Sequence, residues 1–149
     1  MSFLSPLMLL GCLTFATDAP FDDAVKKDLQ QFQGSWRAAS IINADGRPAT
    51  TEEIEHTRLV VDGNRFTLKG KDFILRGTFT IDPTKTAKTI DAVLDSKEGE
   101  KQVKVLGIYR IDGPIRRSCF AMPDKPRPAN FPASPKDYLQ FEWKRDVGK

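Results

Sequence analysis

The sequence predicts an all-β fold: an eight-stranded antiparallel up-and-down barrel preceded by one short helix. From residue 35 onward, apolar residues recur with a period of two, which is typical of strands with one buried face. Turn sequences such as Asp62-Gly63-Asn64 divide this region into short segments. Eight short strands with brief connections indicate a meander, and eight is about the number that closes into a barrel holding one small ligand.

The helix is expected over residues 21–33, where Phe21, Val25, Leu29 and Phe32 are spaced to form one apolar face. Gly34 is a favourable residue to end it. One further helical turn, capped by a threonine, is expected at 50–57. The strands are expected at 35–43, 57–62, 65–69, 73–82, 88–94, 102–111, 115–121 and 138–145.

Alternation along these strands assigns every second side chain to the barrel interior. The apolar residues expected there are Trp36, Ala38, Ile42, Leu59, Val61, Phe66, Leu68, Phe73, Leu75, Phe79, Ile81, Ile90, Leu94, Val105, Tyr109, Phe120, Phe141 and Trp143. Many of these side chains are large, so a barrel of eight strands could be filled completely and hold no cavity.

Composition indicates one ordinary folded domain, expected over residues 18–149. The net charge of +3 is far below that of a nucleic-acid-binding surface. Lysines and aromatic residues interleave in 65–76, but alternation places most of the charges opposite the aromatics, so no nucleic-acid partner is expected. Two cysteines supply no disulfide framework, and Cys119 is expected to fill the core rather than react.

Residues 1–17 carry no charge and are expected to be a signal peptide or apolar leader. Its apolar run is too short for a membrane-spanning helix. Two processing sites overlap there: cleavage after Ala16, or a lipobox at residues 9–12 that would leave Cys12 lipidated. The protein is therefore expected to be exported to the periplasm, the cell envelope or the medium, with a lipid anchor at Cys12 as its one route to the membrane.

Gly34 and Trp36, at the start of the first strand, resemble the G-x-W motif of lipocalins. That resemblance implies that Trp36 plugs the closed end of the barrel and that an arginine of the last strand lies across it. Arg145 fits this role, because it is in phase with the apolar side of the strand at 138–145.

Several longer stretches are more specific: GTFTIDPTKTAKTID, LGIYRIDG, CF and KPRPANF, together with QGSW and the terminal WKR. They resemble an uncharacterised family of small secreted lipocalin-like domains abundant in planctomycete bacteria. The resemblance covers about residues 28–146. It implies a calycin-like barrel and an exported protein, and it implies no reaction.

The strand at 115–121 departs from that family, in which the positions of Arg116 and Ser118 are usually apolar. In phase with Phe120, both would face inward, where an unpaired charge is costly. Arg116 would then meet a carboxylate or phosphate of a ligand. Two alternatives remain: a one-residue register shift that turns Arg116 outward, or a place at the barrel mouth where the guanidinium reaches water.

Motifs for catalysis are absent from the sequence. His56 is the single histidine and lies in a polar turn without metal-ligand neighbours, so no metal site, cofactor or catalytic residue is expected. The sequence favours an exported, non-enzymatic binding protein for a small apolar or amphipathic molecule, with Tyr109, Arg116 and Ser118 as candidate polar contacts. The alternative is a cell-envelope protein-interaction module with a filled core that docks its partner through the proline-rich loop 122–137.

Overall fold

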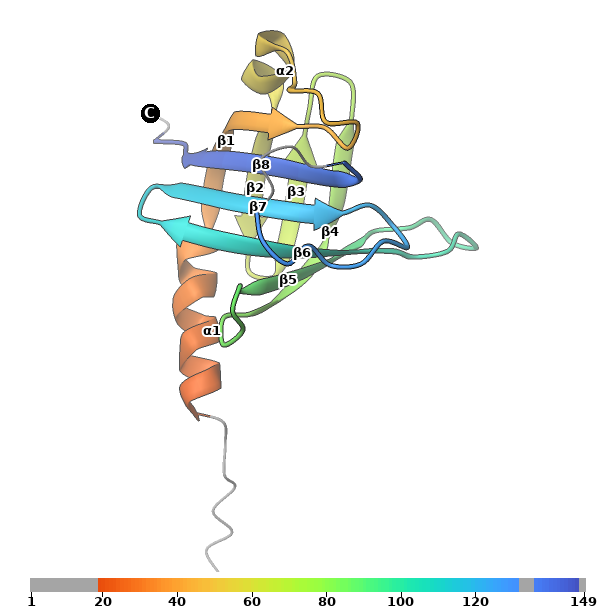
Figure 1. Ribbon diagram of the computed structural model, residues 1–149. Helices are drawn as coiled ribbons and strands as arrows, with labels where there is room; N and C mark the ends of the chain where they lie inside the picture. The colour runs from red at the N-terminus through yellow and green to blue at the C-terminus, as the bar shows by residue number, and fades with distance from the viewer. Residues whose placement is uncertain (1–18, 132–135, 148–149) are drawn as a thin grey trace, which may run out of the picture.

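The computed structural model describes residues 19–131 and 136–147 of the chain. Eight antiparallel strands form a closed barrel in which each strand pairs with the next and the last pairs with the first (Figure 1). The predicted fold class is therefore confirmed. The expected leader at 1–17, with Cys12, lies outside the described residues.

The elements follow one another in the predicted order. The helices are α1 (Ala19–Phe32) and α2 (Thr51–His56). The strands are β1 (Gly34–Ile42), β2 (Arg58–Asp62), β3 (Arg65–Lys69), β4 (Ile74–Asp82), β5 (Thr89–Leu94), β6 (Val103–Asp112), β7 (Ile115–Ala121) and β8 (Tyr138–Arg145). Every strand bound lies within one residue of its prediction.

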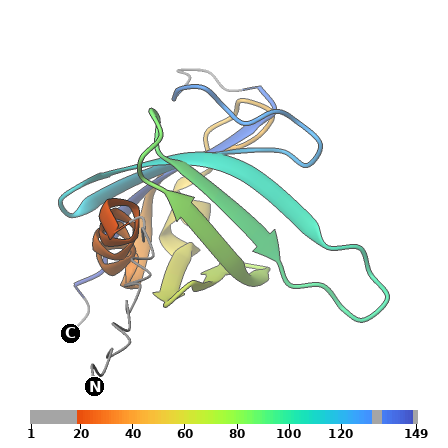
Figure 2. The ribbon, with the colours of Figure 1, turned by 90° about the horizontal axis from the view of Figure 1, so that it is seen from below.

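The two ends of the barrel differ. At one end α1 runs directly into β1, and its last residue, Phe32, is fully buried against Phe79 and Tyr109. At the other end lie α2 and the connections β3–β4, β5–β6 and β7–β8. The β5–β6 hairpin projects well beyond the barrel wall, as both ribbon views show (Figures 1 and 2). Helix α1 therefore closes one end only.

Side chains cap the carboxyl end of α1, where backbone carbonyls have no partner within the helix. Trp36 Nε1 donates to the Phe32 carbonyl at 2.8 Å. Arg145 Nη1 and Nη2 donate to the carbonyls of Gln33 and Gln31 at 2.8 and 2.7 Å. The Arg145 guanidinium also lies 4.4 Å from the centre of the Trp36 ring, which is the contact that the lipocalin resemblance implies. One tryptophan and one arginine thus fasten the helix, the first strand and the last strand together.

Gly34 is needed for this junction. Its φ of +103° is one that residues with a side chain rarely adopt, and it turns the chain from α1 into β1. A Cβ built there would lie 3.4 Å from Arg145 Nη1, so the position also leaves room for the guanidinium. Gly34 thus allows the tight turn, and the Arg145 guanidinium packs against both that turn and Trp36 two residues later.

The interior assignment is wrong at the end of β1. Ile41, not Ile42, is buried, because the register between β1 and β8 shifts between Ala38 and Ser40. Such a bulge adds one residue to one strand and reverses the alternation beyond it.

The prediction also fails at the start of β4. Phe73 precedes the strand, is about half exposed and packs on Gly70 in the β3–β4 connection. Leu75 lies on the predicted side, but near the end of the barrel, where it is partly exposed. A period of two predicts which face of the sheet a side chain lies on, but it does not predict at which residue the strand reaches the end of the barrel.

Candidate binding site inside the barrel

The barrel encloses a cavity of about 290 Å³. Its lining side chains come from strands β2 to β8 and from the start of the β7–β8 connection, and nearly all are apolar, among them Leu68, Phe79 and Trp143. Two lining residues are polar, Arg116 and Ser118, and both belong to β7. The core is thus not completely filled, and its empty space is apolar apart from one short stretch of one strand.

The cavity opens at the end of the barrel opposite α1. Leu75, Val103 and Met122 line it there and are each more than a third exposed, so they form an apolar rim. We call these three residues the rim. A group of exposed apolar side chains around a cavity can mark a ligand-binding groove. The opening therefore suits an apolar molecule.

Arg116 lies at the opposite, closed end of the cavity, which we call the floor. The side chain faces inward and the residue is only 4% exposed. Its guanidinium carbon lies 3.9 Å from the centre of the Phe32 ring and 5.9 Å from that of Trp36. Aromatic faces attract a cation, and these two rings fix the guanidinium plane. The outward register and the mouth position, the two alternatives for Arg116, are both excluded.

The Arg116 guanidinium lacks polar partners. Nε and Nη1 are buried and donate no hydrogen bond to any described residue. Desolvation by burial lowers the pKa of Arg116 from 12.5 to about 9, and the nearby Tyr109 offsets this only in part. The group therefore remains a cation at neutral pH, in a place where its charge is unfavourable.

Ser118 lies two residues further along β7, on the same inward face. It is 1% exposed, and its Oγ is buried without a hydrogen-bond partner among the described residues. Two polar side chains on one strand are thus both directed into an otherwise apolar cavity. Native proteins leave few buried polar groups unsatisfied, so each such group calls for an explanation.

Tyr109, the third predicted contact, is engaged elsewhere. It is not part of the cavity lining, and its hydroxyl donates to Asp28 Oδ2 of α1 at 2.7 Å. Lys88 Nζ donates to the same oxygen at 2.9 Å. Burial raises the pKa of Tyr109 far above its usual range, and the hydrogen bond to Asp28 raises it further. Tyr109 therefore helps to hold α1 on the closed end, and the structure brings Arg116 and Ser118 together without it.

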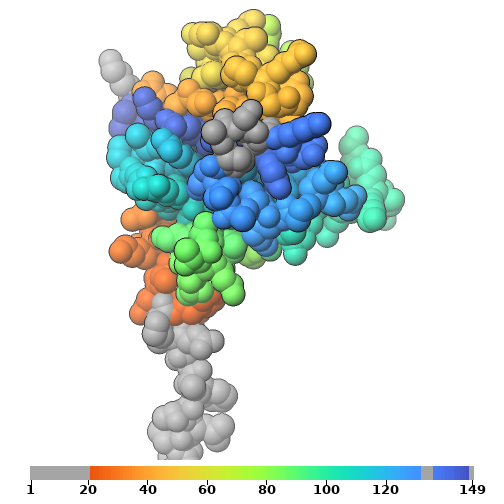
Figure 3. Space-filling view, in the orientation of Figure 1, coloured from red at the N-terminus to blue at the C-terminus, as the bar shows by residue number. Residues whose placement is uncertain are grey.

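The first segment of the proline-rich loop, residues 122–131, folds back onto the outside of the barrel. Arg127 donates to the carbonyl of Gly107 at 2.8 Å and pairs with Asp91 at 2.6 Å, and Pro128 is buried. Figure 3 shows this segment in blue beside the β4–β5 connection in green. The loop is thus fastened to β5 and β6.

A second hollow, of about 650 Å³, lies between that loop and the β4–β5 connection. It is larger than the barrel cavity but more open, and the Arg127–Asp91 pair in its lining already neutralises itself. Asp91 Oδ1 in this lining has no hydrogen bond, but it lies 2.6 Å from Arg127 Nη2, so its charge is balanced, whereas no described residue balances the charge of Arg116. The inner cavity is therefore the better candidate site.

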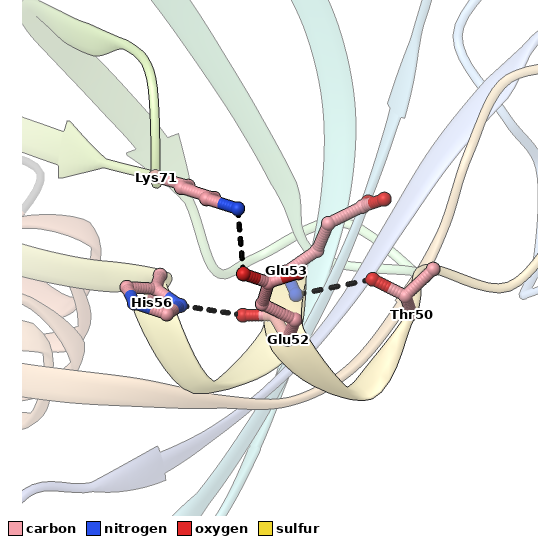
Figure 4. Close-up of polar contacts among 5 residues, drawn as sticks. All are labelled: Thr50, Glu52, Glu53, His56 and Lys71. Carbon is pink, nitrogen blue, oxygen red and sulfur yellow. Dashed lines mark hydrogen bonds and ion pairs between the residues drawn. The ribbon is translucent and has the colours of Figure 1, made fainter.

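His56 lies on the exposed helix α2, near the open end (Figure 4). Its Nδ1 is 2.8 Å from the Glu52 carbonyl oxygen, and Lys71 of the β3–β4 connection donates to the Glu52 carboxylate. Within residues 19–131 and 136–147, no group of three or more His, Cys, Asp or Glu could hold a metal ion. The same residues include no helix that is long and apolar enough to cross a membrane.

Cys119 is fully buried, but on the outer side of the barrel wall. It lies directly across from Ile108, which lines the outer hollow beneath Arg127 and Pro128. Burial raises the pKa of its thiol to about 11, as befits a packing residue.

Ala92, a small residue that leaves space in the cavity, was missed in the sequence analysis. Ala92 lines the cavity and is in phase with Ile90 and Leu94, yet it was not among the expected interior residues. The same phase could have identified it, because an alanine at an inward position among large residues signals missing volume. No family model, curated protein or solved structure matched the chain in the three comparisons.

Proposed function

We propose that the protein is an exported, non-enzymatic binding protein that holds one small apolar or amphipathic molecule inside its barrel. The observation that carries the proposal is the apolar cavity of about 290 Å³ with its apolar rim. Sites for small molecules begin at about 300 Å³ and are mostly apolar with a few placed polar groups. Support for export comes from the uncharged leader at residues 1–17 and from the resemblance to secreted domains.

Away from Arg116 and Ser118, the cavity favours an apolar occupant over water, because water there would find too few hydrogen-bond partners. The closed end gives the site a fixed depth, since Phe32 and Trp36 are fully buried behind it. A molecule that enters past the rim would therefore bury most of its surface without a rearrangement of the strands.

A cavity-filling substitution tests the proposal. Ala92→Leu adds three carbons inside the cavity, whereas Val93→Leu places the same leucine side chain on the outward side of the same strand and adds one carbon there. The neutral fluorescent probe N-phenyl-1-naphthylamine should bind the wild type and Val93→Leu, and its affinity for Ala92→Leu should fall at least tenfold. Equal binding to all three proteins, or to none, would contradict binding in the barrel.

The rival function, an envelope interaction module acting through loop 122–137, assumed a filled core, and the cavity counts against it. The anchoring of 122–131 by Arg127 also leaves less of that loop free to dock. Shortening the loop separates the two functions: partner capture should be lost if the loop acts, while probe binding should persist if the barrel acts.

A further inference from the structure

The charge of Arg116 is not balanced by any residue that the structure describes. Arg116 takes part in none of the ion pairs found within residues 19–131 and 136–147. Asp28, the one acid counted as buried among the described residues, already accepts hydrogen bonds from Lys88 and Tyr109. A buried cation without a counter-charge costs several kcal/mol unless an anion joins it. The missing anion must come from outside the described chain.

The donors that lack partners belong to two residues that line the same cavity. They are Nε and Nη1 of Arg116 and Oγ of Ser118, all buried, from residues spaced about 7 Å apart along one face of β7. Phe32 covers one face of the guanidinium at 3.9 Å, so the N–H groups on its edge are the ones left for a ligand. One charged and one neutral donor thus face the same cavity and are left for an acceptor group of a ligand.

The amount of charge selects among anions. Arg116 supplies one positive charge, and Ser118 supplies a hydroxyl but no charge. A carboxylate carries one negative charge and would neutralise the site. A phosphate monoester carries about −1.5 to −2 at neutral pH and would leave an uncompensated negative charge in an apolar cavity.

We propose that the occupant of the barrel is an amphipathic monocarboxylate, bound with its carboxylate on Arg116 and Ser118 and its apolar chain directed toward the rim. The inference rests on the proposed function, because it names the class of molecule held in the same cavity. The acid enters past Leu75 and Met122, and its head group reaches the floor. No bond is made or broken.

Three probes with the same ten-carbon chain test the head group: decanoate, 1-decanol and decyl phosphate. Decanoate should bind the wild type at least tenfold more tightly than either of the others. Arg116→Met should weaken decanoate by roughly 10- to 100-fold, the usual effect of losing a charge-assisted hydrogen bond, and change decanol binding by less than threefold. Ser118→Ala should weaken decanoate by roughly 2- to 10-fold.

A matched control lies one residue along the chain. Arg117 points outward, is half exposed and pairs with Glu142 at 3.3 Å. Arg117→Met should therefore leave the binding of all three probes unchanged. If Arg117→Met weakens decanoate as much as Arg116→Met does, the effect comes from net charge and the head-group assignment is wrong.

The tryptophans report the orientation of the ligand. The chain has two, and both lie near the floor: Trp36 within 5.9 Å of the Arg116 guanidinium, and Trp143 directly across from Arg116 on β8. Because bromine quenches a nearby indole, 2-bromodecanoate should quench the fluorescence more strongly than 10-bromodecanoate. The opposite order would place the head group at the rim and overturn the proposal.

The outcomes separate the two proposals. If decanol and N-phenyl-1-naphthylamine bind but decanoate has no advantage, the head-group inference fails and the binding function stands. If decyl phosphate binds most tightly, the monoanion assignment fails. If no probe binds the wild type, the binding function itself fails.

Discussion

Arg116 has a cost in stability that no contact within the described chain offsets. The guanidinium gains attraction from two aromatic rings, at 3.9 and 5.9 Å, which is worth about 2 kcal/mol when desolvated. The loss of water from a buried ion costs several kcal/mol. Desolvation therefore outweighs the ring contacts in the empty barrel.

Arg116→Met should accordingly stabilise the empty protein. Methionine has a similar length and no charge, so the free energy of unfolding at pH 7 should rise by about 1–4 kcal/mol. Urea denaturation of the ligand-free protein measures it, with the outward Arg117→Met as the control that should change stability by less than about 1 kcal/mol. A marked loss of stability in Arg116→Met would show that the guanidinium is already well satisfied.

The stability gained by Arg116→Met should become smaller at high pH. The folded pKa of Arg116, about 9, is below its ordinary 12.5. Below pH 9 both states are charged and the wild type carries the full cost. Above pH 9 the folded state loses its proton while the unfolded state keeps it, so wild-type stability rises relative to the variant. The advantage of Arg116→Met should shrink between pH 9 and 10.5, and a constant advantage would contradict the burial of a charge.

Arg145 contributes at the residue scale through its contacts with the end of α1. Arg145→Met removes two hydrogen bonds to backbone carbonyls and the contact with Trp36, and should lower the free energy of unfolding by about 1–3 kcal/mol. Lys144→Met, one residue earlier on the exposed face, is the control and should change stability little. Equal effects of the two substitutions would show that the helix cap has no energetic role.

At the scale of elements, α1 acts as the lid of the closed end. Its buried face presents Phe32 to Phe79 and Tyr109, and Asp28 to Tyr109 and Lys88. The helix therefore covers the floor with the Phe32 ring, and its Asp28 binds Tyr109 and Lys88 of the barrel. The guanidinium of Arg116 rests on this lid through the Phe32 ring.

Phe32→Ala should destabilise the protein by about 3–5 kcal/mol, because it removes a fully buried ring and leaves a void beneath Arg116. Phe21→Ala, on the same helix but partly exposed, should cost less than about 1 kcal/mol. Thermal and urea unfolding measure both. Similar small effects would mean that α1 is only loosely attached to the barrel.

The sequence predicted elements whose signals are local. The bounds of β3, β7 and β8 are as predicted, because Gly and Asp turns or the proline-rich loop end each of them. The bulge between Ala38 and Ser40 was missed, because it has no sequence signal and arises from pairing with β8. The inward phase of Arg116 was predictable, but its lack of a partner was not, since that depends on where Asp28 and Tyr109 lie in three dimensions.

At the scale of the whole molecule, the barrel combines a tightly fastened end with an open one. Phe32, Trp36 and Arg145 fix the closed end, whereas the rim of Leu75, Val103 and Met122 leaves apolar surface exposed at the other. Between them lies a cavity whose one buried charge has no partner among the described residues. The exposed rim, the empty cavity and the unpaired charge each cost stability in an empty protein, and an amphipathic acid would offset these three together.

A crystal structure with 10-bromodecanoate tests this account most directly, because the anomalous signal of bromine locates the end of the chain. We expect one bromine peak beside Leu75 and Met122, with the carboxylate within hydrogen-bond distance of Arg116 and Ser118. A bromine next to Arg116, or a ligand bound only outside the barrel while the cavity stays empty, would contradict it.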